Sequence, residues 1–565
     1  MTEHAVTAPL RVDSAEQLHW QQRADLVVVG FGGAGASAAI EAASRGLSVL
    51  VLERFAGGGA TALSGGVVYA GGGTPQQLQA GYQDSSEAMF NYLRKEVGDA
   101  VSEQTLRTFC EGSLEQLAWL ERQGAVFEGS MAPHKTSYPS DRYYLYYSGN
   151  EAVPSYAVDA PAAPRGHRTK GSGMSGSALF RALADSARRH GVQVRTQCQV
   201  RRLVIDRDGQ VIGVEAWQLP VGSRAARSHA RLARWAAAVH MYVPALSAKL
   251  RARMQRLEQR HAQPLLVRAE HGVVLASGGF VFNRQLLGEH APRYLDGLPL
   301  GSSGCDGSGI DLGRSVGGSL GRMDKVSAWR FINPPLAWAR GLIVNARGER
   351  YCNEELYGAT LGHAMVEEQD GRALLILDRT LRNQALAQVG PGKVWSFQRL
   401  PVLLNLLFNC RRGKTLEQLA ERCQLPAQAL RHSVDSYSRA ARGEIADPLG
   451  KSASMLHDLG QGPWYCLDLS YDSQLYPCPT LTLGGLRVCE QSGRVLDQQG
   501  APIAGLYGTG RCAVGVASNL YVSGLSLADC VFSGRRAAAH VAELAARQRA
   551  PQGEQPCNAQ LISGT

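Results

Sequence analysis

Apolar and polar positions follow a strand–helix–strand pattern at the start of this chain, and part of that pattern returns near its end. Residues 25–53 read DLVVVGFGGAGASAAIEAASRGLSVLVLE: an apolar strand, a glycine turn, an alanine-rich helix and a second strand. Such a run is typical of a parallel sheet covered on both faces. Residues 273–280 (VVLASGGF) and 505–511 (GLYGTGR) again place a glycine turn after a strand. The pattern predicts an α/β sheet that both ends of the chain build.

Other patterns fill the chain between these segments. Residues 85–125 carry helical periodicity, and residues 191–217 alternate like two paired strands joined at a turn over 207–209. Residues 222–263 then interrupt the sheet pattern with a basic amphipathic helical stretch that Pro244 breaks or kinks. Because this insertion connects two strands, we expect it to project outward from the fold.

Positive charge is concentrated in that insertion. Between Arg224 and Arg260 there are nine basic residues and one acid, in a chain of net charge +10. Residues 394–414 add a second apolar stretch that ends in basic residues. Lys and Arg on one face with Trp, Leu and Phe on the other are typical of helices at a membrane surface. We expect 225–262 and 394–414 to contact a membrane, with oligomer formation and ordinary packing as alternatives. Nucleic acid is not expected, because no reading module accompanies the basic run.

The first glycine turn has the spacing of a dinucleotide site. Gly30, Gly32 and Gly35 form G-x-G-x-x-G, which provides a tight turn, close approach to a pyrophosphate and close helix–strand packing. The following helix directs its positive N-terminus at the phosphates. Glu53 ends the next strand, 18 residues after Gly35, and its carboxylate suits a pair of ribose hydroxyls.

Further glycine-rich segments favour FAD over NAD. Residues 56–73 hold more glycine than a turn requires, which lets backbone approach a flat, extended ligand closely. With 273–280, 505–511 and GCDGSGIDLGRSVGG at 304–318, they resemble the fumarate reductase/succinate dehydrogenase flavoprotein superfamily. The resemblance covers about residues 24–542. It implies FAD contacts from Gly30, Gly32, Gly33, Ala34, Gly35, Glu53, Arg54, Thr61, Ser64, Gly65, Gly66, Val200, Ala276, Ser277, Gly278, Asp306, Gly510, Arg511, Gly524, Leu525, Ser526 and Leu527.

The same resemblance implies a Rossmann-like FAD-binding α/β domain with an inserted α+β substrate domain. We place the FAD-binding domain at 20–290 and 470–545, the substrate (catalytic) domain at 291–469, and tails at 1–19 and 546–565. A length of 565 residues with 44% hydrophobic content suits a large globular enzyme. Twelve scattered cysteines without a C-x-x-C pair indicate free thiols and predict no metal site. With no apolar leader or spanning run, we expect a cytoplasmic enzyme, with peripheral attachment to the inner face of the cell membrane as a further possibility.

The substrate class follows from the residues expected to face the flavin. Fumarate reductases deliver a proton from an Arg that follows an R-F-V-N-E-like stretch. The matching stretch is RYCNEELYGATLG at 350–362, and Tyr357 stands where that Arg is expected. A tyrosine there resembles the ketosteroid dehydrogenases, whose fused-ring substrates need apolar walls, a phenol for the ketone and a base for the neighbouring proton.

Residues near the C-terminus distinguish the steroid subtypes. Tyr521-Val522-Ser523-Gly524 resembles the 3-ketosteroid Δ4-dehydrogenase pattern, and Leu525 stands where Δ1-dehydrogenases carry Gly. The resemblance implies oxidation of a saturated 3-ketosteroid to a 4-ene-3-ketosteroid, in steroid or bile-acid catabolism. Tyr521 would bind the C3 carbonyl, and Ser523 with Tyr357 would accept the C4 proton while the C5 hydride passes to FAD.

The segment DRYYLYYSGNE at 141–151 also resembles the part of that family that covers the steroid. It implies that Tyr144, Tyr146 and Tyr147 form the pocket wall. The alternatives are a Δ1-dehydrogenase, a fumarate reductase-like flavin ene-reductase and a flavoprotein without catalytic activity. Both 5α and 5β ring junctions fit these residues, and a quinone or another oxidant would accept the electrons.

Overall fold

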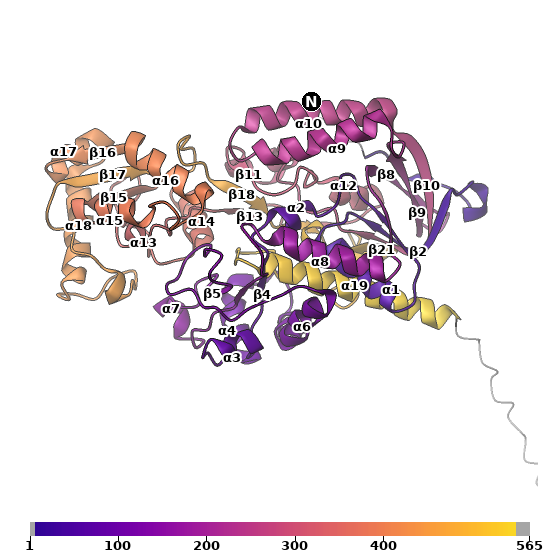
Figure 1. The fold of residues 1–565 in the computed structure, drawn as a ribbon, viewed down its shortest axis with the longest axis horizontal. Helices are drawn as coiled ribbons and strands as arrows, with labels where there is room; N and C mark the ends of the chain where they lie inside the picture. The colour runs from indigo at the N-terminus through magenta and orange to yellow at the C-terminus, as the bar shows by residue number, and fades with distance from the viewer. Residues whose placement is uncertain (1–5, 550–565) are drawn as a thin grey trace, which may run out of the picture.

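A nine-stranded sheet forms the centre of the larger unit (Figure 1). The computed structural model describes residues 6–549. In the middle of this sheet, β10 (Gln263–Leu275) runs parallel to both β2 (Gln22–Val29) and β21 (Pro502–Gly508), with Val273 opposite both Val27 and Leu506. The prediction that both ends of the chain build one α/β sheet is therefore confirmed. Its other strands are β1 (Leu10–Arg11), β3 (Val49–Leu52), β7 (Gln193–Arg195), β8 (Cys198–Ile205), β9 (Val211–Gln218) and β20 (Arg494–Leu496).

The helices next to this sheet also join the two ends of the chain. α1 (Gly33–Ser44) packs along α19 (Leu525–Arg549), and a Cβ built on Gly534 would lie 2.5 Å from the Ala34 carbonyl oxygen. Glycine is needed there because the two helix backbones are this close. The remaining helices of this region are α8 (Gly176–Arg189), α11 (Arg284–His290) and α12 (Ser308–Ser315).

The N-terminal segment is part of the fold. Leu10 and Arg11 pair with Val204 and Ile205 of β8, and Trp20 is buried while its indole N–H donates to the Ala15 carbonyl. The prediction of a loosely attached tail over 1–19 is therefore wrong for residues 6–19. At the other end, α19 continues to Arg549, so the predicted tail 546–565 begins within a helix, and its part beyond residue 549 lies outside the described residues.

A smaller helical lobe lies below the large sheet in Figure 1. Its three-stranded sheet orders β4 (Val67–Tyr69), β6 (Gly166–Arg168) and β5 (Leu145–Tyr146). The helical periodicity of residues 85–125 corresponds to three of its helices, as predicted. The helices are α3 (Pro75–Gln79), α4 (Ser86–Val97), α5 (Glu103–Glu111), α6 (Ser113–Gln123) and α7 (Pro154–Ala157), whereas α2 (Gly59–Leu63) packs on α8 of the larger unit.

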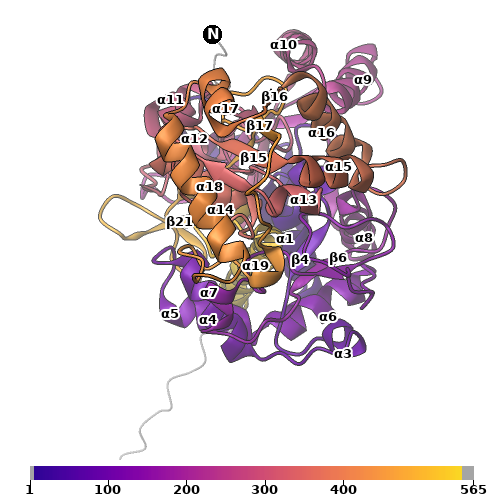
Figure 2. The ribbon, with the colours of Figure 1, turned by 90° about the vertical axis from the view of Figure 1, so that its left-hand side faces the viewer.

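The inserted unit is an α+β structure that faces the viewer in Figure 2. Its antiparallel sheet orders β14 (Leu342–Val344), β15 (Leu374–Asp378), β17 (Trp464–Asp468) and β16 (Cys410–Gly413). Its helices are α13 (Leu336–Ala339), α14 (Gly358–Glu368), α15 (Arg379–Gln388), α16 (Ser396–Phe408), α17 (Leu416–Cys423) and α18 (Ala427–Ala441). Short strands connect it to the large unit: β11 (Leu298–Pro299), β12 (Leu320–Gly321), β13 (Val326–Ala328), β18 (Pro479–Thr482) and β19 (Gly485–Leu486).

The basic insertion forms a helical hairpin along the top of the large unit (Figure 1). α9 (Arg224–Val239) and α10 (Pro244–His261) connect β9 to β10, and Pro244 is the first residue of α10, so the predicted break is correct. Within 394–414 only the first part is helical, as α16, because residues 410–413 form β16 and pair with β17. Among residues 6–549, none of the helices combines the length and apolar content that crossing a bilayer requires.

Candidate active site

The first glycine turn is shaped by close backbone contacts. Gly30 has φ +101°, and a Cβ on it would lie 2.7 Å from the Ala276 carbonyl oxygen at the end of β10. A Cβ on Gly35 would lie 2.0 Å from the Gly30 carbonyl oxygen, so α1 can start directly against the turn. The Gly33 N–H donates to the Thr61 hydroxyl at 2.9 Å. These contacts bring three predicted cofactor segments to one edge of the sheet.

Glu53 is held at the end of β3 by two backbone amides. Its Oε2 accepts from the Phe31 N–H at 2.8 Å and its Oε1 from the Phe55 N–H at 2.7 Å. Burial raises the pKa of this carboxyl, although both amides and the neighbouring Arg54 oppose that shift. Each oxygen keeps a second lone pair, so the group can still accept hydrogen bonds from a ribose.

Arg54 and Asp306, both predicted to bind the cofactor, form an ion pair. Arg54 Nη1 lies 2.7 Å from Asp306 Oδ2, and its other two nitrogens bond Glu258 of α10. Asp306 Oδ1 also accepts from the Ser308 N–H at 3.1 Å, at the start of α12. The insertion therefore reaches the cofactor edge, a contact that the sequence pattern did not predict.

Arg511 provides an unpaired buried donor at the same edge. It follows Gly510 after β21, and its Nη2 contacts the Cys305 sulfur at 3.4 Å. Its Nη1 is buried and has no hydrogen-bond partner within residues 6–549. A buried guanidinium nitrogen without a partner is costly, so it indicates a missing acceptor. Glycines that admit no Cβ, together with this donor, fit the extended and anionic shape of FAD.

The other predicted cofactor residues come from several elements of the larger unit and from the turn before α19. Gly524, just before α19, has φ +91°, and a Cβ on it would meet the Tyr69 nitrogen at 2.8 Å. The remaining residues are Gly32 and Ala34 at the start of α1, Ser64, Gly65 and Gly66 after α2, Ser277 and Gly278 after β10, Leu525, Ser526 and Leu527 in the first turn of α19, and Val200 in β8. Their contacts with FAD stay a prediction.

Two predicted catalytic residues, Tyr357 and Ser523, lie with the predicted wall residue Tyr146, and the three come from distant segments. Tyr146 OH of β5 and Ser523 Oγ are 3.3 Å apart. Ser523 also interacts with the Tyr357 phenol, opposing the larger effect of burial on the pKa of that phenol. Tyr146 and Tyr357 are buried and Ser523 is half-buried. Three hydroxyl groups therefore meet beside the N-terminal end of α19.

An aromatic wall continues this cluster. The Tyr521 ring lies 4.6 Å from Trp329, the Trp329 ring 5.5 Å from Phe331, and the Phe331 ring 6.0 Å from Tyr357, as centroid distances. The Trp329 indole N–H is buried and has no hydrogen-bond partner within the described residues. Sequence reasoning missed Trp329 and Phe331. The two closely spaced aromatic residues in SAWRF (327–331), just before the inserted unit, could have indicated them.

Two of the three predicted wall tyrosines have other contacts. The Tyr144 hydroxyl donates to the Gly171 carbonyl at 3.3 Å, and its ring lies under the buried Arg168 guanidinium. The Tyr147 ring packs edge-on against Tyr82 at 6.1 Å. Of the three, Tyr146 is the one that the structure groups with Ser523, so the predicted wall role of Tyr144 and Tyr147 gains no support.

The phenols of this cluster are poor bases. Burial raises the pKa of Tyr146, Tyr357 and Tyr521 above the ordinary value for tyrosine, and for Tyr521 the positive charge of Arg511 works against that shift. At neutral pH all three therefore carry their protons. They are suited to donate hydrogen bonds to a ketone, and a proton taken from a substrate has to be passed on.

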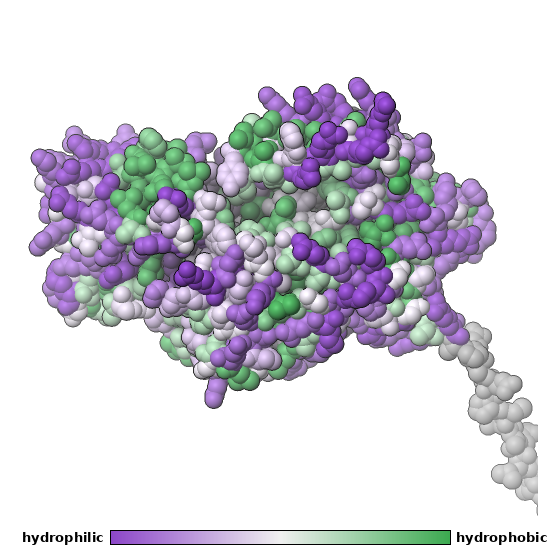
Figure 3. Space-filling model, in the orientation of Figure 1, coloured by the Kyte–Doolittle hydropathy of each residue, from purple (hydrophilic) through white to green (hydrophobic). Residues whose placement is uncertain are grey.

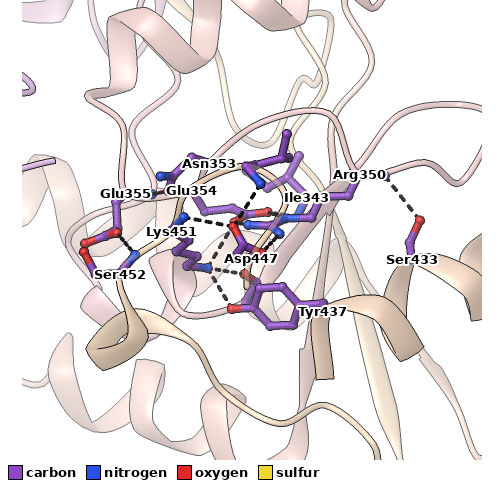
Figure 4. Close-up of polar contacts among 12 residues, drawn as sticks. Ile343, Arg350, Asn353, Glu354, Glu355, Ser433, Tyr437, Asp447, Lys451 and Ser452 are labelled. Atoms are coloured by element: carbon purple, nitrogen blue, oxygen red, sulfur yellow. Dashed lines mark hydrogen bonds and ion pairs between the residues drawn. The ribbon is translucent and has the colours of Figure 1, made fainter. Parts of the chain in front are cut away.

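The motif that contains Tyr357 is fixed by buried ion pairs (Figure 4). Glu354 accepts from Arg350 Nη2 at 2.8 Å and from Lys451 Nζ at 3.0 Å, and Lys451 also donates to the Tyr437 hydroxyl. Burial would raise the pKa of Glu354, but Lys451 and Arg350 hold it below its ordinary value. The loop before Tyr357 is therefore rigid, and Glu354 acts in structure rather than chemistry.

A second buried network holds Tyr357 from the helical lobe. The Tyr357 N–H donates to Asn150 Oδ1 at 2.6 Å, and Asn150 Nδ2 donates to Glu96 Oε1 at 3.0 Å and to Thr360 Oγ1 at 2.9 Å. Burial raises the pKa of Glu96 to about 7. Sequence reasoning missed this network because its members lie on separate elements without a shared motif.

Fold and site together define a flavoprotein with an aromatic, hydroxyl-lined pocket. The family model for the FAD binding domain matches residues 25–527, and the chain belongs to this family, so FAD as cofactor is confirmed. The chain is 43% identical to the 3-oxo-5-alpha-steroid 4-dehydrogenase of Comamonas testosteroni, over 90% of this chain and 96% of that protein. It is 27% identical to the 3-oxosteroid 1-dehydrogenase of Mycobacterium tuberculosis, over 93% of this chain and 100% of that protein.

A solved structure has the same fold over nearly the whole chain. It is the 3-ketosteroid-delta4-(5alpha)-dehydrogenase from Rhodococcus jostii RHA1 in complex with 4-androstene-3,17-dione. The TM-score is 0.80 at 32% identity, covering 95% of this chain and 100% of that chain. The predicted fold class and the resemblance to the Δ4-dehydrogenases are both confirmed.

Proposed function

We propose that this protein is an FAD-dependent 3-oxo-5α-steroid 4-dehydrogenase. It converts a saturated 3-ketosteroid with a 5α ring junction into a 4-ene-3-ketosteroid. The observation that carries the proposal is the meeting of Tyr146, Tyr357 and Ser523 beside the Tyr521–Trp329–Phe331 wall. A flat apolar substrate with one ketone needs such a combination of aromatic surface and neutral hydrogen-bond donors.

Tyr521 binds and polarises the ketone in this proposal. Its phenol is protonated at neutral pH, since burial raises its pKa. A hydrogen bond from it to the C3 oxygen strengthens as negative charge develops there, which makes the neighbouring C4–H more acidic. Packing against Trp329 fixes the direction of the ring, so the donor is already aimed when the steroid arrives.

Ser523 and Tyr357 accept the proton from C4, with Tyr146 as a third member of the hydroxyl cluster. The 3.3 Å contact between Tyr146 and Ser523 lets a proton move along the cluster. Because these hydroxyl groups are protonated at neutral pH, the cluster passes the proton on to solvent. Asn150 and Glu96 hold the Tyr357 backbone N–H rather than its phenol, so they position this residue. When bound, FAD accepts the hydride that leaves C5.

Anaerobic mixing of the purified protein with 5α and 5β forms of a saturated 3-ketosteroid tests the proposal. Loss of the oxidised flavin absorbance with the 5α form, together with appearance of a 4-ene-3-ketone, is the expected result. Bleaching by a 4-ene-3-ketone with formation of a 1,4-diene would replace the proposal by a Δ1-dehydrogenase. Absence of bleaching by all three steroids would contradict a steroid dehydrogenase of either kind.

A membrane surface is the further partner that we propose. Exposed apolar side chains near the turn between α9 and α10 are Trp235 of α9, Met241, Tyr242 and Val243 of the turn, and Leu246 of α10. α16 exposes Phe397, Leu400, Leu407 and Phe408. Figure 3 shows apolar patches over α16 and over that end of the hairpin on one face of the molecule, with hydrophilic surface along the rest of the hairpin. Apolar side chains beside Arg and Lys favour an anionic lipid surface. Steroids partition into lipid, and a quinone acceptor would be met there.

Vesicle binding of variants in these exposed apolar residues tests membrane contact. Deletion of the whole hairpin is a poorer test, because it would also remove the contact between Glu258 and Arg54. Replacing Tyr242, Leu246 and Leu407 by Ser should reduce binding to vesicles that contain anionic lipid. The matched control is Val158→Ser, since Val158 is 86% exposed but lies elsewhere, in the helical lobe. Equal binding of the triple variant and the control variant would contradict membrane contact through this face.

A further inference from the structure

One buried carboxylate joins the helical insertion to the cofactor edge. Glu258 of α10 is 6% exposed, and its Oε1 and Oε2 accept from Arg54 Nε at 3.0 Å and Arg54 Nη2 at 2.9 Å. Arg54 directly follows Glu53, the acid at the end of β3. Two parallel N–H···O bonds of this kind fix both the distance and the orientation of the two groups.

The other helix of the insertion, α9, contacts the residue that follows Arg54, which is Phe55. His229 of α9 lies with Nε2 3.0 Å from Glu258 Oε1, and its ring stacks on Phe55 at 5.9 Å with an interplanar angle of 11°. The Phe55 N–H in turn donates to Glu53 Oε1 at 2.7 Å. Both helices therefore hold the segment 53–55, one through charge and one through stacking.

The position of Glu258 within the insertion is informative. It is the one acid between Arg224 and Arg260, among nine basic residues, and it points into the protein. Burial acts against its charge, but Arg54 and His229 lower its pKa to about 2, so it stays ionised. Separating the two partners of such a buried pair would leave each charge uncompensated, which costs free energy. The pair therefore keeps α10 and the loop after β3 in one arrangement.

We propose that the α9–α10 insertion is an FAD-retention element, in which Glu258 and His229 are positioning residues. They hold Arg54 and Phe55, and through these residues they hold the Glu53 carboxylate in place for the ribose of the adenosine half. The third nitrogen of Arg54 bonds Asp306, so the loop before α12 is tied to the same point. This inference depends on FAD as cofactor and not on the proposed steroid.

The rate of FAD release tests the proposal. Holoprotein is diluted into flavin-free buffer, and the rise of free-flavin fluorescence is followed over time. Glu258→Gln keeps the shape but removes the charge, and should release FAD about 10-fold faster, the effect of a lost charged hydrogen bond. His229→Gln should accelerate release by a smaller factor. Arg253→Gln, an exposed charge on the same helix, should release FAD at the wild-type rate.

The same variants separate this role from the steroid chemistry. The release assay contains no steroid, so its result does not depend on whether the proposed steroid reaction is correct. Unchanged FAD release in Glu258→Gln, or equal acceleration in Arg253→Gln, would overturn the proposal. If Glu258→Gln does not fold, His229→Gln decides, since it retains the Arg54–Glu258 pair: wild-type release in that variant would overturn the proposal as well.

Discussion

The buried Glu96 should make stability depend on pH in a direction that one substitution removes. Glu96 lies on α4 with no exposed surface, and its Oε1 accepts from Tyr92 and Asn150 while its Oε2 is buried without a partner in the described part of the chain. Burial is the largest cause that raises its pKa from 4.5 to about 7. Glu96→Gln replaces this carboxyl with a neutral group of the same shape.

The sign follows from the raised pKa. Below pH 4.5 the carboxyl is protonated in the folded and the unfolded chain, and its contribution to stability is complete. Between pH 4.5 and pH 7 the carboxyl of Glu96 is ionised in the unfolded chain but still protonated in the folded protein, so the free energy of unfolding decreases as pH rises through this range. At 1.36 kcal/mol for each pKa unit, the full loss is about 3 kcal/mol, and most of it falls between pH 5 and pH 8. Glu96→Gln does not suffer this loss.

Calorimetry of the two holoproteins at several pH values measures the difference. If the whole chain unfolds together, the melting temperature of Glu96→Gln should rise relative to wild type by about 2 °C from pH 5 to pH 8. Glu111→Gln, at an exposed position on α5, is the control and should follow wild type. A melting-temperature difference between Glu96→Gln and wild type that does not change with pH would refute the reasoning.

Three further predictions concern the site itself. Tyr521→Phe should lower the rate of flavin reduction by 5α-3-ketosteroid about 100-fold, because it removes the donor to the developing oxyanion. Stopped-flow absorbance measures this rate, and an unchanged rate would contradict the role of Tyr521. Asn150→Ala should lower the same rate about 10-fold with a smaller change in the steroid Kd, because the Tyr357 N–H loses its hydrogen-bond acceptor. A change in the steroid Kd alone would contradict the role of Asn150 in positioning Tyr357. Arg511→Met should weaken FAD binding about 10-fold in ultrafiltration, and full retention of FAD would show that the unpaired guanidinium nitrogen does not face the cofactor.

Local patterns were sufficient to predict the cofactor edge. The G-x-G-x-x-G spacing, Glu53 and the late GLYGTGR strand follow from backbone requirements that act over a few residues, and the strands pair as predicted. The helical insertion and its break at Pro244 were predictable for the same reason, since periodicity and proline geometry are local properties.

Contacts between distant segments could not be predicted in this way. Arg54 and Glu258 are 204 residues apart, and Tyr357 and Asn150 are 207 residues apart. A single sequence gives the composition of each segment but not which buried charges or amides meet. The prediction for the basic insertion therefore used only its basic and exposed apolar residues. Its one acid, Glu258, which faces the fold, was not assigned a role.

The packing of α19 on α1 also determines when this protein can become functional during synthesis. α19 packs closely on α1 at Gly534, and Tyr521 and Ser523 precede α19 by a few residues. A nascent chain that has not yet released its C-terminal region from the ribosome therefore lacks part of both the cofactor fold and the hydroxyl cluster. We expect FAD to be taken up only after α19 has left the ribosome, and the apolar face of α1 to need protection until then.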